Sequence, residues 1–151
     1  MTLDHASAIL TSEWHLIDQP MVDQFADAID DHQFIHTDPV RAKAETSFGG
    51  CIVHGFYLLA LLTRLSQQAL PTTSPGTVEI NYGFDKVRFL NPVPVSSHVR
   101  GHFTLLDSNA KGTATLKRYS VELEIHGTSR PALVAEWLVM LDYPQPLKGN
   151  P

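Results

Sequence analysis

The segment from Val53 to Leu70 contains more apolar residues than one helix face can hold. The following residues cover nearly the whole circumference of the predicted helix: Phe56, Leu58, Leu59, Ala60, Leu61, Leu62 and Leu65. A helix that is apolar on all sides must be buried on most of them. The apolar run from Phe56 to Leu62 is also far too short to span a bilayer. The sequence therefore predicts a fold built around one central helix.

The second half of the chain is strand-like. In 116–125, Tyr119, Val121, Leu123 and Ile125 alternate with polar residues, which is typical of a strand with one buried face. Residues 78–89, 95–105 and 132–141 are the other predicted strands, and 107–112 and 127–131 are predicted hairpin links. Gly83 is predicted to mark a bulge or a point of close approach. An antiparallel sheet that curls around the helix would bury it. We therefore predict an α+β fold of the hot-dog type, and the two apolar faces of 132–141 favour a dimer.

The first fifty residues predict shorter elements. Residues 12–18 are a candidate strand, and Asp18 is a candidate N-cap of a helix that ends near Asp30. The segment from Asp31 to Pro39 has no clean period, so we predict an irregular loop there. A short helix is predicted over 39–44, followed by a turn at 48–50.

Size and charge restrict the class of protein. A chain of 151 residues suits one domain, predicted over 1–143, with a flexible tail over 144–151. The net charge is −5 and no basic run occurs, which gives no support to a nucleic-acid or membrane partner. Cys51 is the single cysteine, so an internal disulfide and a multi-thiolate zinc site are excluded. The first residues do not resemble a signal peptide, and we expect a cytoplasmic protein.

Three positions suggest chemistry. Asp31 and His36 lie five residues apart in the irregular segment, and His54-Gly55 opens the apolar helix eighteen residues later. An Asp/His pair can move a proton, and a helix N-terminus can stabilise developing negative charge. From residue type alone, a turn role for Asp31 and a backbone-bonded loop role for His36 stay open, and for His54 a structural role at the helix start is favoured over a catalytic one.

A metal site is the weaker interpretation of the same residues. His32, His36 and His54 could be grouped with Asp31 or Asp38, and His32 and His36 have the i, i+4 spacing of a shared helical metal site. The missing helical period in this segment argues against that geometry. We expect no metal.

Two runs resemble a known family. Asp31-His-Gln-Phe-Ile-His36-Thr-Asp-Pro, within 25–42, and the run 48–56 with His54-Gly55 resemble the MaoC-like dehydratases, which include the (R)-specific enoyl-CoA hydratases. Within that family the first run is most similar to the nodulation protein N branch, as is the run 82–89 followed by Pro92-Val93.

The resemblance implies a hot-dog homodimer that interconverts trans-2-enoyl thioesters and (3R)-3-hydroxyacyl thioesters. By position, Asp31 and His36 match the catalytic pair of the family, and Gly55 matches the glycine whose amide holds the thioester carbonyl. Candidate substrate-binding residues are Gln33, His54, Tyr57 and Arg88. We expect no separate cofactor, because coenzyme A is part of the acyl-CoA substrate.

Two other functions remain open. A hot-dog thioesterase would act on the same thioesters, but 55–70 contains no Asp or Glu to activate water there. A non-catalytic acyl-thioester-binding module is kept open by Asp30, which stands where the family has glycine. It is also kept open by the scarcity of hydroxyls early in the helix, where only Tyr57 and Thr63 carry one.

Overall fold

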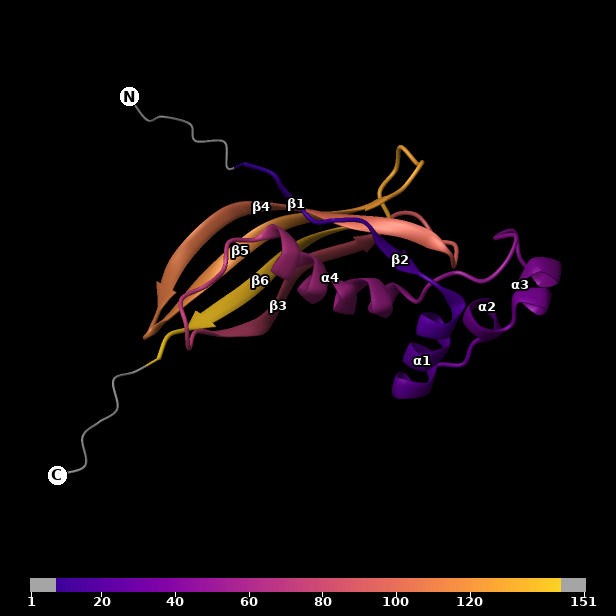
Figure 1. Cartoon of the computed structure of the whole chain (residues 1–151), viewed down its shortest axis with the longest axis horizontal. Coiled ribbons are helices and arrows are strands. Elements are labelled where there is room, and N and C mark those ends of the chain that lie inside the picture. Colours follow the sequence, from indigo (N-terminus) through magenta and orange to yellow (C-terminus); the bar gives the residue numbers. More distant parts are fainter. Residues whose placement is uncertain (1–7, 145–151) are drawn as a thin grey trace.

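The computed structural model describes residues 8–144, and it consists of one antiparallel sheet curled over a central helix (Figure 1). The sheet order is β1-β4-β5-β6-β3, and β2 also pairs with β4. The strands are β1 (Leu10–Thr11), β2 (His15–Ile17), β3 (Val78–Phe89), β4 (Ser97–Lys111), β5 (Ala114–Ile125) and β6 (Leu133–Asp142). This arrangement confirms the predicted α+β hot-dog fold.

Helix α4 (Gly55–Ala69) provides one side of the core. Its leucines Leu58, Leu61, Leu62 and Leu65 are buried, in one cluster with sheet residues such as Phe103. The helix begins two residues later than the sequence predicts, because residues 51–53 are extended against 93–95. There the Val53 amide donates to the Val93 carbonyl (2.8 Å) and the Val95 amide to the Cys51 carbonyl (3.0 Å).

The strands differ from prediction mainly at their ends. The predicted hairpin link at 107–112 is wrong, since β4 continues to Lys111 and pairs with β5 up to the turn. An ion pair between Arg118 and Asp107 (2.6 Å) joins the two strands in this extension. The predicted bulge at Gly83 is confirmed by a register shift against β6. The predicted strand at 12–18 is only three residues long, and the two-residue β1 was not predicted.

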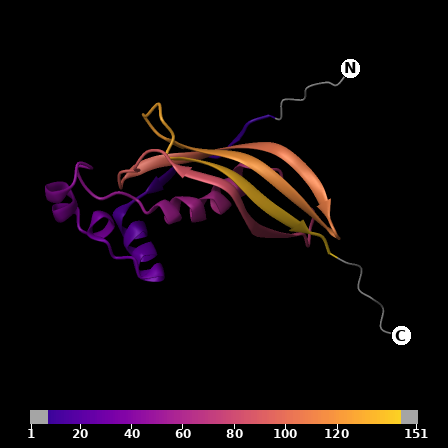
Figure 2. The same cartoon turned by 180° about the vertical axis from the view of Figure 1, so that it is seen from behind.

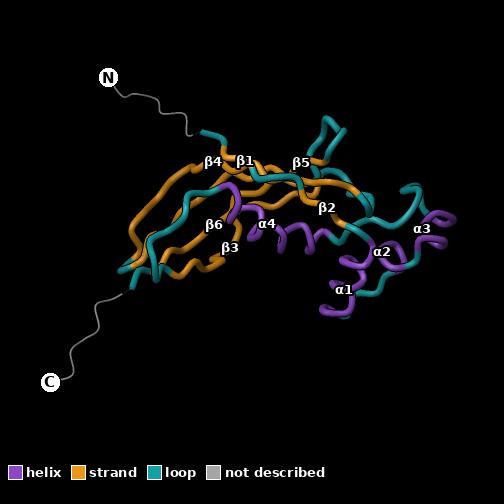
Figure 3. Tube along the Cα trace, viewed as in Figure 1, coloured by secondary structure: helices purple, strands orange, loops and turns teal. Residues whose placement is uncertain are grey.

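Three short helices gather at the end of the sheet where α4 begins (Figures 2 and 3). They are α1 (Gln19–Ile29), α2 (Phe34–Thr37) and α3 (Pro39–Glu45). The Asp18 carboxylate accepts from the Met21 amide and the Asp38 carboxylate from the Arg41 amide, so both residues are N-caps. The predicted irregular loop therefore contains one helical turn, α2, which is too short to show a period.

Three smaller predictions concern the C-terminal tail, membrane-spanning segments and the single cysteine. Residues 145–151, most of the tail predicted to be flexible, lie outside the described residues. In the described part, none of the helices is long and apolar enough to cross a membrane. The Cys51 thiol is free and buried.

Candidate active site

The ends of three elements converge beside the start of α4. Asp31 follows α1, His36 lies in α2 and His54 is the N-cap residue of α4. One polar side-chain atom from each of these residues lies within 4.8 Å of the other two. The structure therefore brings together three of the residues that the sequence singles out, with Gly55 next in the chain.

His36 is held from both sides. The ring is 7% exposed, and its Nδ1 lies 2.7 Å from the Ile52 carbonyl. Because a carbonyl only accepts hydrogen bonds, Nδ1 carries the hydrogen and Nε2 of the neutral ring is an acceptor. The Gln19 amide nitrogen donates to the His36 carbonyl (2.7 Å) and fixes the backbone. Burial, with a smaller effect from His54, lowers the pKa of His36, although the Ile52 hydrogen bond and Asp31 oppose that shift.

His54 contacts both other members of the cluster. Its ring stacks on that of His36, with centroids 3.8 Å apart and planes 22° apart. Its Nε2 lies 3.1 Å from the Asp31 carbonyl and 3.9 Å from Asp31 Oδ2. The residue is 2% exposed, and its Nδ1 has no hydrogen-bond partner within residues 8–144. His54 therefore lies beneath the Asp/His pair, not at its surface.

The Asp31 side chain is the accessible member of the cluster. It is 44% exposed, and Oδ1 accepts a long hydrogen bond (3.4 Å) from the Gln33 amide. The neighbouring Asp30 caps α1 in a left-handed conformation (φ 56°), and its side chain is 98% exposed. The two adjacent carboxylates are therefore not buried together.

Gly55 leaves space at the first turn of α4. A Cβ at this position would lie 3.0 Å from the ring of Phe89, at the end of β3. The first amides of a helix have no intrahelical acceptor and carry the positive end of the helix dipole. The Gly55 amide can thus donate a hydrogen bond to an oxyanion. A side chain at position 55 would reduce the space between the first turn of α4 and the Phe89 ring.

The other predicted substrate-binding residues do not belong to the cluster of Asp31, His36 and His54. The Gln33 side chain is exposed and makes no capping hydrogen bond to α2, although the Gln33 backbone contacts both members of the pair: its amide donates to Asp31 Oδ1 (3.4 Å), and its carbonyl accepts from the His36 amide (2.9 Å). Tyr57 is half-buried with its ring against Phe25 (5.1 Å), and burial raises its pKa. Arg88 is exposed on β3 and donates to the Val87 carbonyl (2.8 Å).

Sequence reasoning missed the groups that support the cluster. The Ile52 carbonyl is a backbone group, so the residue type at position 52 does not indicate its hydrogen bond with His36. Gln19 looks like an ordinary residue of the first turn of a helix. Phe25, whose ring lies 5.3 Å from that of His54, is an apolar residue of a helix, a residue type that by itself indicates only packing.

Asp31, His36 and His54 form the group that could hold a metal ion within residues 8–144. A tetrahedral metal needs ligand lone pairs that point to one centre. The two imidazoles are stacked with an angle of 22° between their planes, so their in-plane lone pairs lie in two nearly parallel planes and do not converge on one centre. The arrangement fits a hydrogen-bonded acid/base site better than a metal centre. His32, drawn into the predicted alternative, faces Asp27 and Asp30 at 3.7 Å.

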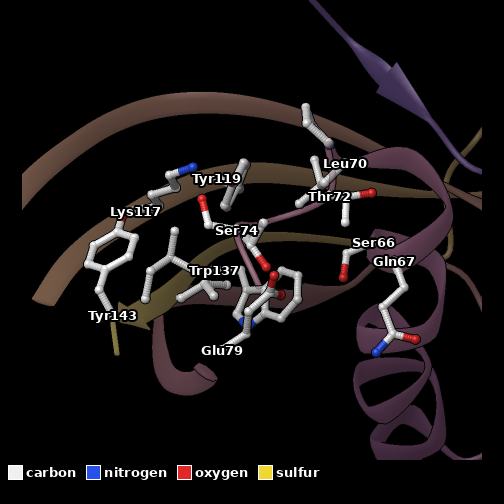
Figure 4. Close-up of a pocket in the computed structure, with 14 residues that line it drawn as sticks. Ser66, Gln67, Leu70, Thr72, Ser74, Glu79, Lys117, Tyr119, Trp137 and Tyr143 are labelled. Atoms are coloured by element: carbon white, nitrogen blue, oxygen red, sulfur yellow. The ribbon is translucent and has the colours of Figure 1, made fainter. Parts of the chain in front are cut away.

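A cavity of about 370 Å³ lies at the opposite end of α4 (Figure 4). Ser66, Leu70 and Ser74 line one side, and the rings of Tyr119 and Trp137 line the sheet side. A second, open hollow of about 400 Å³ borders Phe48, Ile52 and Pro92. Neither is lined by Asp31, His36 or Gly55, so we place the candidate chemistry at the cluster and not in these cavities.

Comparison with known proteins identifies the family. The model of the MaoC-like domain matches residues 3–125. Nodulation protein N of Rhizobium meliloti (strain 1021) is 47% identical over 134 residues, which are 88% of this chain and 83% of that protein. A protein of Mycobacterium tuberculosis (strain ATCC 25618 / H37Rv) named 3-hydroxyacyl-thioester dehydratase Z is 46% identical over 129 residues, 85% of this chain and 84% of the relative.

Solved structures agree on the fold. The (R)-hydratase from A. caviae involved in PHA biosynthesis superposes with a TM-score of 0.71 at 22% identity, covering 95% of this chain and all of that one. The resemblance inferred from the two runs is thus confirmed, including the likeness to nodulation protein N. This chain belongs to the MaoC-like dehydratase family and is an enzyme of the hydro-lyase class.

Proposed function

We propose that this protein interconverts trans-2-enoyl-CoA thioesters and (3R)-3-hydroxyacyl-CoA thioesters. The observation that carries the proposal is the meeting of the Asp31 carboxylate and the His36 ring beside the first amide of α4. The names of the 46% identical dehydratase and of the superposed (R)-hydratase support the same reaction.

The chemistry assigns one task to each group. Asp31 takes one proton from a water molecule as the water oxygen bonds to C3, and the C2=C3 electrons move toward the thioester oxygen. His36 Nε2 accepts a hydrogen bond from the other O–H, which stays on the product as its hydroxyl. Protonated Asp31 then delivers a proton to C2, and the carboxylate is regenerated. General acid–base catalysis of this kind contributes about 10²–10⁴-fold in rate.

The Gly55 amide stabilises the enolate-like oxygen, and a methyl group at this position should disturb it. We expect Gly55→Ala to lower kcat/KM by at least about 10-fold, since misplacement near 1 Å is costly. The half-exposed Phe89 ring can shift to relieve the contact, so stability should change little. Gly50→Ala is the matched control, because a Cβ there meets nothing within 4 Å. Equal kcat/KM values for the two variants would contradict this prediction, because the methyl group would then not disturb the place assigned to the enolate-like oxygen.

Activity should persist to a lower pH than an ordinary histidine would allow. Burial lowers the pKa of His36, so the ring stays neutral, and Nε2 stays an acceptor, to a lower pH than in an ordinary histidine. We expect the acidic decline of kcat/KM, as His36 protonates, to lie below the ordinary histidine pKa. A pH profile of kcat/KM reports the groups of the free enzyme. An acidic limb at or above the ordinary histidine pKa would contradict this role.

We propose a homodimer that pairs through β3. Among residues 8–144, this edge strand of twelve residues pairs with β6 alone, and it exposes Val78, Ile80, Tyr82, Phe84 and Phe89. Phe56, beside Gly55, is 70% exposed. Long apolar edges are normally covered. Sedimentation equilibrium should give twice the chain mass of 16.7 kDa, and a monomer at micromolar concentration would refute the pairing.

A thioesterase is the second candidate, and α4 disfavours it, because Gly55–Ala69 contains no carboxylate to attack the carbonyl carbon.

We propose that the reaction uses no metal and no separate cofactor. We also propose that Arg88 contacts the phosphates of coenzyme A.

The test that separates hydratase from thioesterase uses crotonyl-CoA and a C8 enoyl-CoA with two readouts, loss of the enoyl absorbance and release of free thiol. Loss without thiol release supports the hydratase; thiol release, or no change with either substrate, contradicts it.

A further inference from the structure

His54 has contacts that neither a substrate ligand nor a plain helix cap requires. It is 2% exposed, so almost none of its ring is open to a bound thioester. It makes no side-chain capping hydrogen bond to α4. Its two close contacts are instead the Asp31 carbonyl (3.1 Å) and the face of the His36 ring (3.8 Å between centroids). Both contacts go to the proposed catalytic pair.

We infer that His54 is a positioning residue that fixes Asp31 and His36 relative to each other. This inference rests on the proposed function. The Nε2 hydrogen of His54 binds the Asp31 carbonyl, which holds the loop after α1, and the flat ring of His54 sets the plane of His36. Because His54 is also the N-cap of α4, the same residue connects the pair to the amide of Gly55.

The hydrogen bonds specify opposite tautomers for the two rings. His36 carries its hydrogen on Nδ1, toward Ile52, and leaves Nε2 free for water. His54 carries its hydrogen on Nε2, toward Asp31, and leaves Nδ1 as a lone pair that no group within residues 8–144 satisfies. A buried acceptor without a partner costs free energy. The contact with Asp31 thus fixes one tautomer of His54 and leaves its Nδ1 unsatisfied.

Phe25 supports this arrangement from the other side. Its ring meets His54 edge-to-face at 5.3 Å, and it contacts Tyr57 in the same way at 5.1 Å. His54 is therefore enclosed by an apolar ring, the His36 ring and the Asp31 backbone. A side chain packed in this manner has little freedom to move, which suits a group that sets the geometry of others.

Two substitutions separate the two contacts. His54→Gln keeps an amide donor near Nε2 and loses the stacked ring, whereas His54→Phe keeps a ring and loses the donor. We expect each to lower kcat for enoyl-CoA hydration by about 10–100-fold with KM within about threefold. His32→Gln is the control, since His32 lies in the same loop but is half-exposed and outside the cluster, and it should keep normal kcat. A KM raised more than about tenfold with unchanged kcat would make His54 a substrate ligand and overturn the inference.

A measurement on the unmodified protein does not depend on activity or on the folding of variants. Long-range ¹H–¹⁵N spectra of the imidazoles should show Nδ1–H for His36 and Nε2–H for His54 at mildly alkaline pH. A His54 ring with its hydrogen on Nδ1 would overturn the inference, whether or not the protein hydrates enoyl-CoA. If these tautomers are found and turnover is absent, the proposed function fails while the positioning contacts stand.

Discussion

Replacing Asp31 by Asn should lower kcat for enoyl-thioester hydration by about 10²–10⁴-fold, the range that general acid–base catalysis supplies. The amide has nearly the same shape as the carboxylate, but it can neither take a proton from water nor return one to C2. The Asp31 side chain is 44% exposed, and the contact with His54 runs through the Asp31 backbone carbonyl. The fold and the His54 contact should therefore survive the change.

Binding should survive as well. A saturated thioester such as butyryl-CoA should bind Asp31→Asn with a Kd within a few-fold of the wild type, because Asp31 is assigned to the water and not to the thioester. Asp30→Asn is the matched control, since that side chain is 98% exposed beside the site. Unchanged turnover in Asp31→Asn would remove Asp31 as the base. Equal losses in both variants would indicate a general charge effect instead.

Replacing Leu62 by Ala should destabilise the fold by about 2–5 kcal/mol, as large-to-small changes in well-packed cores do. Leu62 is fully buried in α4 and belongs to the cluster that joins the helix to the sheet. The loss combines the transfer of the side chain with the cavity that remains. Urea unfolding followed by circular dichroism measures it.

Leu106→Ala makes the same chemical change at a position that is 48% exposed in β4. It should alter stability by no more than about 0.5 kcal/mol. Similar losses in the two variants would mean that α4 is not the centre of the core. The comparison therefore tests the feature of the sequence on which the predicted fold rests.

The fold could be predicted where one pattern ran long enough. The apolar run of α4 and the alternation in β5 both predict elements that are present. The burial predicted for most sides of α4 is wrong, because one face (Leu58, Leu61, Leu62 and Leu65) is buried while Phe56 and Ala60 are exposed. The ends were less predictable, because they depend on partners distant in sequence. Residues 107–111 look like a polar link, yet they extend β4 since β5 pairs with them and Arg118 binds Asp107. Helix α2 has four residues, about one helical turn, so no repeat of the helical period can appear in its sequence.

The candidate site, like the fold, could be predicted from the sequence only in part. Residue types and spacing selected Asp31, His36 and the His54-Gly55 start of α4, and the structure places them together. The carbonyl that orients His36 belongs to Ile52, and an isoleucine side chain does not predict that hydrogen bond. The stacking of His54 on His36 depends on how α2 meets α4, which no local pattern specifies. Backbone groups and contacts between elements were therefore visible only in three dimensions.

The most direct test of the central claim is the configuration of the product formed by the wild-type protein from crotonyl-CoA. Chiral chromatography of the hydrolysed product should show (3R)-3-hydroxybutyrate alone, formed as the enoyl absorbance falls and without free thiol in the reaction. The (3S) enantiomer, a racemate, or thiol release in place of hydration would contradict the assignment of this site to (R)-specific hydration.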